Sequence, residues 1–161
     1  MNTAGVFAGN EIVQMAIQTE EAGNAFYTAA AQAAKSPQVN ELLQWLADQE
    51  LAHKKAFEAM LQDTPSRRPA EEFAGQKGEY IQALLDSRVL PDPGAGTASL
   101  AQMSSDLQAI DFALGFEKDT ILFLYEMRDI VPDSQTQRVD ALIAEEKSHV
   151  KRLSDMKAAM S

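Results

Sequence analysis

Two Glu-x-x-His pairs interrupt apolar stripes in this sequence, and they constrain the fold more than any other feature. The pairs are Glu50 with His53 and Glu146 with His149. Steps of three and four residues from each pair otherwise reach mostly apolar side chains, which is typical of the buried face of a packed helix. The stripes read Val39, Leu43, Leu46, Glu50, His53, Phe57, Met60 and Val139, Leu142, Glu146, His149, Leu153, Met156, Met160. We therefore expect a carboxylate and an imidazole to be buried at matching places on two helices.

Two further apolar stripes each contain one glutamate. Glu20 lies seven residues from both Val13 and Tyr27, and Glu117 lies seven residues before Leu124. Glu20 and Glu50 are 30 residues apart and Glu117 and Glu146 are 29 apart, so the two halves of the chain look like repeats. Each glutamate stands roughly 20 Å from the turn of its own helix pair at 1.5 Å per residue, so all four carboxylates are predicted to meet near the middle of a bundle.

The predicted fold class is an all-α four-helix bundle in a single domain over residues 1–161. Its helices are expected at about residues 10–35, 37–62, 106–131 and 134–160, with Asn10 as the first N-cap and Ser36 before Pro37 as the second. The long connector, residues 63–105, has loop compositions at 64–69 and 91–96 and a possible short helix over 79–88. A connector of this length predicts a crossover or an arm, with room for domain swapping in a dimer.

The six polar residues on these stripes form the pattern of a dinuclear metal site. They comprise one glutamate from each of two helices and one Glu-x-x-His pair from each of the other two, the ligand pattern of di-iron and di-manganese carboxylate bundles. The predicted ligands are Glu20, Glu50, His53, Glu117, Glu146 and His149. Residues three apart share a helix face, and carboxylates from facing helices can bridge two ions. Oxygen and imidazole donors suit two iron ions, with manganese or zinc as alternatives.

The alternative interpretation is a core without metal. A single glutamate on a helix is usually solvated, and a single histidine on an apolar stripe is more often a hydrogen-bonded core residue than a ligand. Four buried carboxylates at one level would cost several kcal/mol each, against a total stability of about 5–15 kcal/mol. No Lys or Arg lies on the four stripes to compensate them. The carboxyls could be protonated, but metal binding is the simpler interpretation.

The composition narrows the classes of ligand and partner. The formal charge of −10 argues against binding to nucleic acid or to an anionic membrane surface. The absence of cysteine excludes thiolate metal sites and iron–sulfur clusters. Met1 to Asn10 lacks the basic and apolar regions of a signal peptide, and no apolar run is long enough to span a membrane, so a cytoplasmic location is expected.

Three residues near the predicted ligands are candidates for supporting roles. Tyr27 could hydrogen-bond a ligand carboxylate or serve as an electron-transfer residue, and it could equally be ordinary core. Gln49 and Glu145 each precede a motif glutamate and could reach across to the N–H of a histidine on another helix.

The sequence resembles the rubrerythrin-like branch of the ferritin-like superfamily. The similar segments lie on all four predicted bundle helices: AIQTEEAGNAFY from Ala16, LADQELAHK from Leu46, FEKDTILFLYE from Phe116 and LIAEEKSHVKRL from Leu142. The resemblance implies a ferritin-like bundle, a non-haem di-iron centre that reacts with hydrogen peroxide or dioxygen, and homodimers that sometimes swap helices. Rubrerythrins carry a further glutamate where this chain has Thr120, and a glutamate in place of His149, so the ligand set is closer to that of bacterioferritin-type centres.

The leading functional hypothesis is a di-iron oxidoreductase that reduces peroxide or dioxygen. The 161 residues contain no cysteine for a rubredoxin-type iron site, so electrons are expected from an external donor such as a rubredoxin or its reductase. Ferrous-iron oxidation for storage or detoxification is one alternative. A non-catalytic helical interaction module stabilised by metal is another.

Overall fold

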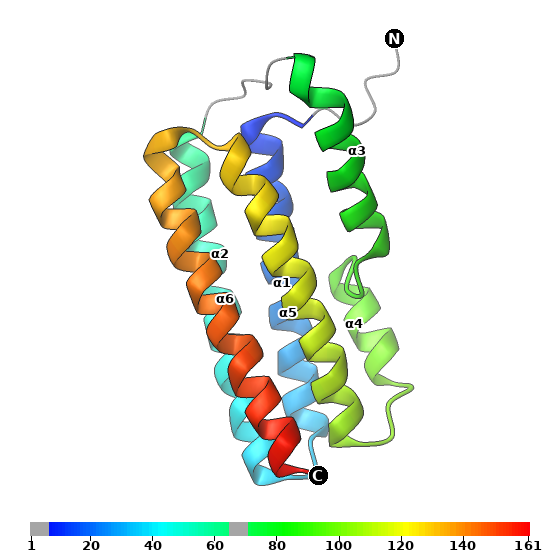
Figure 1. The fold of residues 1–161 in the computed structure, drawn as a ribbon. Coiled ribbons are helices and arrows are strands. Elements are labelled where there is room, and N and C mark those ends of the chain that lie inside the picture. Colours follow the sequence, from blue (N-terminus) through cyan, green and yellow to red (C-terminus); the bar gives the residue numbers. More distant parts are fainter. Residues whose placement is uncertain (1–6, 65–70) are drawn as a thin grey trace.

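Four long helices form an antiparallel bundle, and two shorter helices lie along one side of it (Figure 1). The computed structural model describes residues 7–64 and 71–161, and every regular element in that part is a helix. The helices are α1 Gly9–Ala33, α2 Pro37–Asp63, α3 Glu71–Ser87, α4 Pro93–Leu100, α5 Asp106–Ile130 and α6 Asp133–Ala159. The predicted all-helical fold class is thereby confirmed. None of the helices in the described ranges has both the length and the apolar character required to cross a membrane.

The bundle helices begin and end within about two residues of their predicted positions, but the first cap was assigned wrongly. Helix α1 begins at Gly9 and its N-cap is Ala8, so Asn10 lies inside the first turn. The carboxylate of Glu11 accepts a hydrogen bond of 2.6 Å from the Ala8 N–H and satisfies that donor. Ser36 does cap α2, because its hydroxyl accepts from the Val39 N–H and Pro37 stands at the first helical position.

The connector between α2 and α5 is more helical than the sequence suggested. Instead of a short helix over 79–88 it contains α3, and the stretch 91–96 assigned as a loop includes the start of α4. Asp92 caps α4 by accepting a 2.9 Å hydrogen bond from the Ala95 N–H, and Pro93 occupies the first turn, which is the usual combination at a helix start. Most of the other predicted loop, residues 64–69, lies outside the described residues, which do not include 65–70.

The connector crosses the length of the bundle and packs on it. Helix α3 lies against α5, and α4 lies against α1 (Figure 1). Gly96 makes the second contact close, since a Cβ there would lie 3.0 Å from the Cβ of Phe26 and 2.9 Å from Leu90 Cδ1. The connector is thus a crossover that covers one side of the bundle within the chain. Helix swapping between two chains stays a prediction.

Two apolar clusters fill the bundle, one toward each end. One is built around Phe26, Leu46 and Phe116, and the other around Val13, Phe57 and Phe123. Along each of the four long helices, residues of one cluster give way to residues of the other across a short polar stretch. The polar stretches together form a single layer between the two clusters, and that layer holds the candidate site.

Candidate metal centre

The six predicted ligands meet in the layer between the two apolar clusters. We call this set of six the Glu/His cluster: Glu20, Glu50, His53, Glu117, Glu146 and His149. Each of its side chains is at most 2% exposed. The helical period places them there, because each lies on the stripe of its helix that faces the bundle axis.

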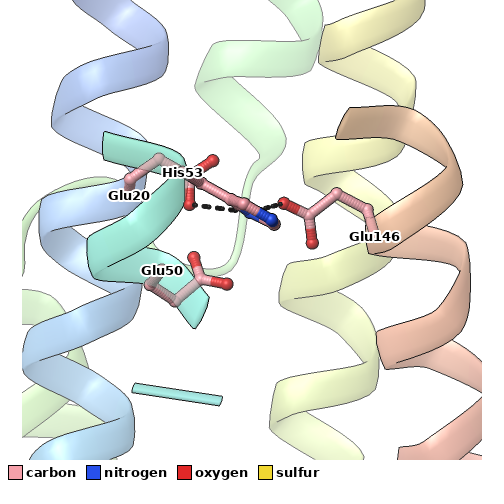
Figure 2. A group of neighbouring side chains, drawn as sticks. All are labelled: Glu20, Glu50, His53 and Glu146. Atoms are coloured by element: carbon pink, nitrogen blue, oxygen red, sulfur yellow. Dashed lines mark ion pairs between the residues drawn. The ribbon is translucent and has the colours of Figure 1, made fainter. Parts of the chain in front are cut away.

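The cluster divides into two overlapping groups of four donors. The His53 position consists of Glu20, Glu50, His53 and Glu146, and the His149 position consists of Glu50, Glu117, Glu146 and His149. In each group, one donor atom per residue lies within 4.8 Å of all the others. Figure 2 shows the side chains of the His53 position converging from α1, α2 and α6. Glu50 and Glu146 belong to both groups, which is the arrangement that two ions sharing bridging carboxylates require.

The distances around Glu146 show how it serves both positions. Its Oε1 lies 2.8 Å from Nδ1 of His53, and its Oε2 lies 2.9 Å from Nδ1 of His149. Two donors bound at right angles to one ion, each at about 2.1 Å, are about 3 Å apart. The remaining contacts are longer, with His149 Nδ1 at 3.6 Å from Glu117 Oε1 and His53 Nδ1 at 3.8 Å from Glu20 Oε2. Each imidazole therefore presents Nδ1 to the centre of its group.

In the described part of the chain, many buried polar atoms of the cluster make no hydrogen bond, even where another atom of the cluster lies 2.8 or 2.9 Å away. They include both carboxylate oxygens of Glu20, Glu50 and Glu146, one oxygen of Glu117 and Nδ1 of both histidines. Buried polar atoms are normally satisfied, and each one left alone costs about 1–3 kcal/mol. A cation among these atoms would satisfy several of them at once. The donor set of carboxylate oxygen and imidazole nitrogen fits iron, manganese or zinc.

Burial and crowding raise the pKa values of three of the four carboxyl groups and leave the fourth, Glu146, with a lowered pKa. The pKa of Glu20 is raised to about 7 and that of Glu117 to about 8, in both cases by burial first and by the negative charge of Glu146 second. Burial and the neighbouring glutamates raise the pKa of Glu50 well above its usual range. Burial also opposes ionisation of Glu146, but its short contacts with His149 and His53 outweigh burial and lower its pKa.

The histidines complete the charge balance of the metal-free cluster. Burial alone would lower their pKa values, but contact with the glutamates raises the pKa of His53 to about 9 and that of His149 to about 10. Without metal, protons thus neutralise most of the layer. No Lys or Arg within residues 7–64 and 76–161 forms an ion pair with a glutamate of the cluster. The positions that hold these protons are the ones that a cation would occupy, so binding must release them.

Tyr27 contacts the cluster from α1. Its hydroxyl donates a 2.5 Å hydrogen bond to Oε1 of Glu117, and its side chain is fully buried. Burial and the charge of Glu117 raise the pKa of the phenol well above its usual value, so the hydroxyl stays a donor. The structure places Tyr27 at a ligand carboxylate, and its role in catalysis stays a prediction.

The two residues expected to support the histidines behave differently. Glu145 is 54% exposed, yet its Oε2 lies 2.7 Å from Nε2 of His53. Gln49, its counterpart on α2, makes no such bond, because Nε2 of His149 has no hydrogen-bond partner in the described part of the chain. The His149 ring instead packs nearly perpendicular to the ring of Trp45, with centroids 5.3 Å apart and an angle of 83° between the rings.

Gly23 is a site residue whose role was missed in the sequence. A Cβ at this position would lie 2.5 Å from Oε2 of Glu50 and 2.7 Å from Cζ of Phe116, so only glycine leaves room for the carboxylate. A glycine inside a helix, one turn after Glu20, is the signal that was available, since glycine there costs about 1 kcal/mol relative to alanine. Thr120 holds the equivalent place on α5, and its hydroxyl donates to the Phe116 carbonyl.

Known proteins resemble this chain in sequence and in fold. The family model described as Rubrerythrin matches residues 11–157, a range that contains the whole Glu/His cluster. A crystal structure described as that of a ferritin-like diiron-carboxylate protein from Thermotoga maritima has a TM-score of 0.72 and 25% sequence identity, and the match covers 97% of this chain and 98% of that one. No curated protein matches the chain. With the family model spanning all four bundle helices and every residue of the cluster, the chain belongs to the rubrerythrin family.

Proposed function

We propose that this protein is a non-haem di-iron oxidoreductase that reduces hydrogen peroxide or dioxygen with electrons from an external donor. The observation that carries the proposal is the pair of overlapping donor groups, in which Glu50 and Glu146 are common to both. The solved relative, described as a diiron-carboxylate protein, supports iron as the metal. Manganese and zinc accept the same donors, so metal identity is part of the proposal.

Charge supports two ions rather than one. Four ionised carboxylates in a layer at most 2% exposed carry four negative charges, and two divalent ions neutralise them without any basic side chain. Two ferrous ions held there would supply two electrons, which with two protons reduce hydrogen peroxide to two waters or dioxygen to hydrogen peroxide. Glu50 and Glu146 would hold the ions at a fixed separation, and His53 and His149 would each bind one of them through Nδ1.

The surroundings of the cluster suit reductive chemistry. The apolar clusters on both sides exclude bulk water from the layer, which strengthens the electrostatic interactions inside it. Tyr27 keeps its proton in this environment and donates it in a hydrogen bond to Glu117, with 2.5 Å between the phenol oxygen and Oε1. It is therefore positioned to fix the orientation of that carboxylate.

Electron delivery and assembly extend the proposal beyond this chain. The sequence contains no cysteine, so it offers no thiolate iron site to relay electrons. We propose a rubredoxin or its reductase as the donor, and a homodimer as the functional assembly.

The proposal is tested by loading the metal-free protein with two ferrous ions under anaerobic conditions and adding a pulse of hydrogen peroxide. Oxidation within the mixing time, with one peroxide consumed for each pair of ferrous ions, is the expected result. Glu50→Ala, which removes one shared ligand, serves as the variant that should not react. Slow or substoichiometric oxidation by peroxide, together with fast oxidation by dioxygen, would identify the protein as an oxidase and would contradict a peroxidase function.

Iron storage makes a different prediction for the same sample. A mineral core needs a hollow shell, so the mass of the protein in solution separates the two functions. A particle of a few chains that turns over peroxide supports the proposed function, whereas a large shell that accumulates ferric iron contradicts it. A metal that raises the melting temperature without any redox turnover would assign the cluster a structural role.

A further inference from the structure

The two ion positions of the Glu/His cluster differ in the support that each histidine receives. The His53 ring is held from both sides, with Nδ1 at 2.8 Å from Glu146 Oε1 and Nε2 at 2.7 Å from Glu145 Oε2. Nδ1 of His149 has the same contact with Glu146, at 2.9 Å, but its Nε2 is buried without a hydrogen-bond partner among the described residues. The cluster is symmetric in its ligands and asymmetric in what surrounds them.

The asymmetry arises because α2 and α6 carry different residues at two equivalent positions. Glu145 precedes Glu146, and the residue in the same place before Glu50 is Gln49. Five residues before Glu146 stands Ala141, whereas the residue five before Glu50 is Trp45. A partly exposed carboxylate thus supports one histidine, and an indole ring packs against the other.

Arg152 and Tyr27 make the His149 position still less like the His53 position. The Arg152 guanidinium lies 4.2 Å from the centroid of the Trp45 ring, which fixes the indole against His149. Tyr27 donates its hydroxyl proton to Glu117 Oε1, one of the donors of this position. A carboxylate oxygen that already accepts a strong hydrogen bond gives less electron density to a cation. Among the described residues, neither oxygen of Glu20 accepts such a hydrogen bond.

We infer that the two positions load in a fixed order, with the first divalent ion bound at the His53 position because Glu145 orients and polarises that histidine. A carboxylate on the outer nitrogen of a metal-binding histidine fixes its tautomer with the proton on Nε2, turns Nδ1 toward the ion and makes it a stronger donor. Removing such a partner typically lowers metal affinity about 10- to 100-fold. This inference rests on the proposed metal binding and adds to it a positioning role for Glu145.

Calorimetric titration of the metal-free protein with Zn²⁺ tests the order of loading. Repulsion between two dications makes the second ion bind more weakly than the first in any such centre. A difference in affinity between the two steps therefore does not show which position fills first, and variants are needed to assign the order. His53→Ala should abolish the tighter step, and His149→Ala should abolish the weaker one. Loss of the tighter step in His149→Ala instead would overturn the inference.

One substitution tests Glu145 itself. Glu145→Gln should weaken the tighter step about 10- to 100-fold. The matched control is Asp48→Asn, which removes the same charge from an exposed residue two places before Glu50 and should change neither step. If Glu145→Gln has no larger effect than Asp48→Asn, the positioning role is wrong.

A spectroscopic measurement gives a second readout that a merely structural role would not move. Proton NMR of the Zn²⁺-loaded protein should show a slowly exchanging Nε2–H of His53, which disappears or shifts in Glu145→Gln. An unchanged Nε2–H signal in that variant would contradict the inference. A wild-type protein that binds no Zn²⁺ at all would instead overturn the proposed function on which the inference rests.

Discussion

Replacing Gly23 by alanine should damage the metal centre while adding only one methyl group. In an ordinary helix this substitution stabilises the protein, because alanine has the higher helix propensity by about 1 kcal/mol. Here the new Cβ would lie 2.5 Å from Glu50 Oε2 and 2.8 Å from Cε1 of the Phe116 ring. Both neighbours are buried, so neither can move into solvent.

The size of the effect follows from these contacts. Ordinary contact begins near 3.4 Å, so the Glu50 carboxylate must shift by about 1 Å. Overpacking of this kind costs about 1–3 kcal/mol, which outweighs or cancels the gain in helix propensity. The net change in the free energy of unfolding of the metal-free protein is therefore a loss of about 0–2 kcal/mol. Since Glu50 belongs to both donor groups, both ion positions should weaken, by at least about tenfold.

A matched control exists on α5. A Cβ at Gly115 would lie 3.6 Å from the nearest atom, Val89 Cγ1, which is ordinary contact. Gly115→Ala should therefore stabilise the protein by up to about 1 kcal/mol and leave metal binding unchanged. The assays are urea denaturation of the metal-free variants and calorimetric titration with Zn²⁺. If Gly23→Ala proves as stable as Gly115→Ala and binds metal as the wild type does, the close approach of Glu50 to α1 has no energetic weight and the reasoning fails.

Three further expectations concern protons and ligands. Folding raises the pKa values of Glu20, Glu117 and His53 from 4.5, 4.5 and 6.5 to about 7, 8 and 9. The stability that these groups contribute is complete below the unfolded pKa values and is lost as pH rises through the folded ones. Thermal melts of the metal-free protein should therefore show the melting temperature falling between about pH 5 and 9. The Zn²⁺-loaded protein should show the opposite slope, since protons compete with the ion, and parallel slopes would contradict the charge balance described above. Tyr27→Phe should lower the free energy of unfolding by about 1–3 kcal/mol in urea, because it leaves Glu117 Oε1 buried without its donor; an unchanged value would mean that the hydrogen bond has no net worth. Glu146→Gln should abolish binding at both positions and Glu20→Gln at one only, which metal analysis of the purified variants decides; equal losses would refute the assignment of Glu146 as the shared ligand.

The bundle and the cluster could be predicted because they depend on helical periodicity. A period of 3.6 residues fixes which side chains face the axis, and a rise of 1.5 Å per residue fixes their height, so the spacing of Glu20, Glu50, Glu117 and Glu146 along the chain was sufficient to place them in one layer. The repeat of the two halves gave an independent check on the same register.

The features that were missed depend on contacts between helices or on local capping. Asp92 and Pro93 begin α4, but among prolines and glycines they were interpreted as loop residues. The need for glycine at position 23 arises from Glu50 and Phe116 on two other helices, and no pattern within α1 contains their distance to it. Gln49 and Glu145 occupy equivalent places in the sequence, and only their neighbours in space separate the residue that binds a histidine from the one that does not.

The polar layer between the two apolar clusters has a consequence for the lifetime of the folded chain. It divides the core into two apolar halves that are coupled through six polar side chains. In the absence of an ion, the middle of the bundle is therefore the section with the lowest local stability. Local opening there exposes helical backbone to proteases, whereas an ion that binds only the native state suppresses the opening by mass action. With metal bound as proposed, a cell that cannot supply the ion would clear this protein by proteolysis, and the abundance of the chain would follow the availability of the metal.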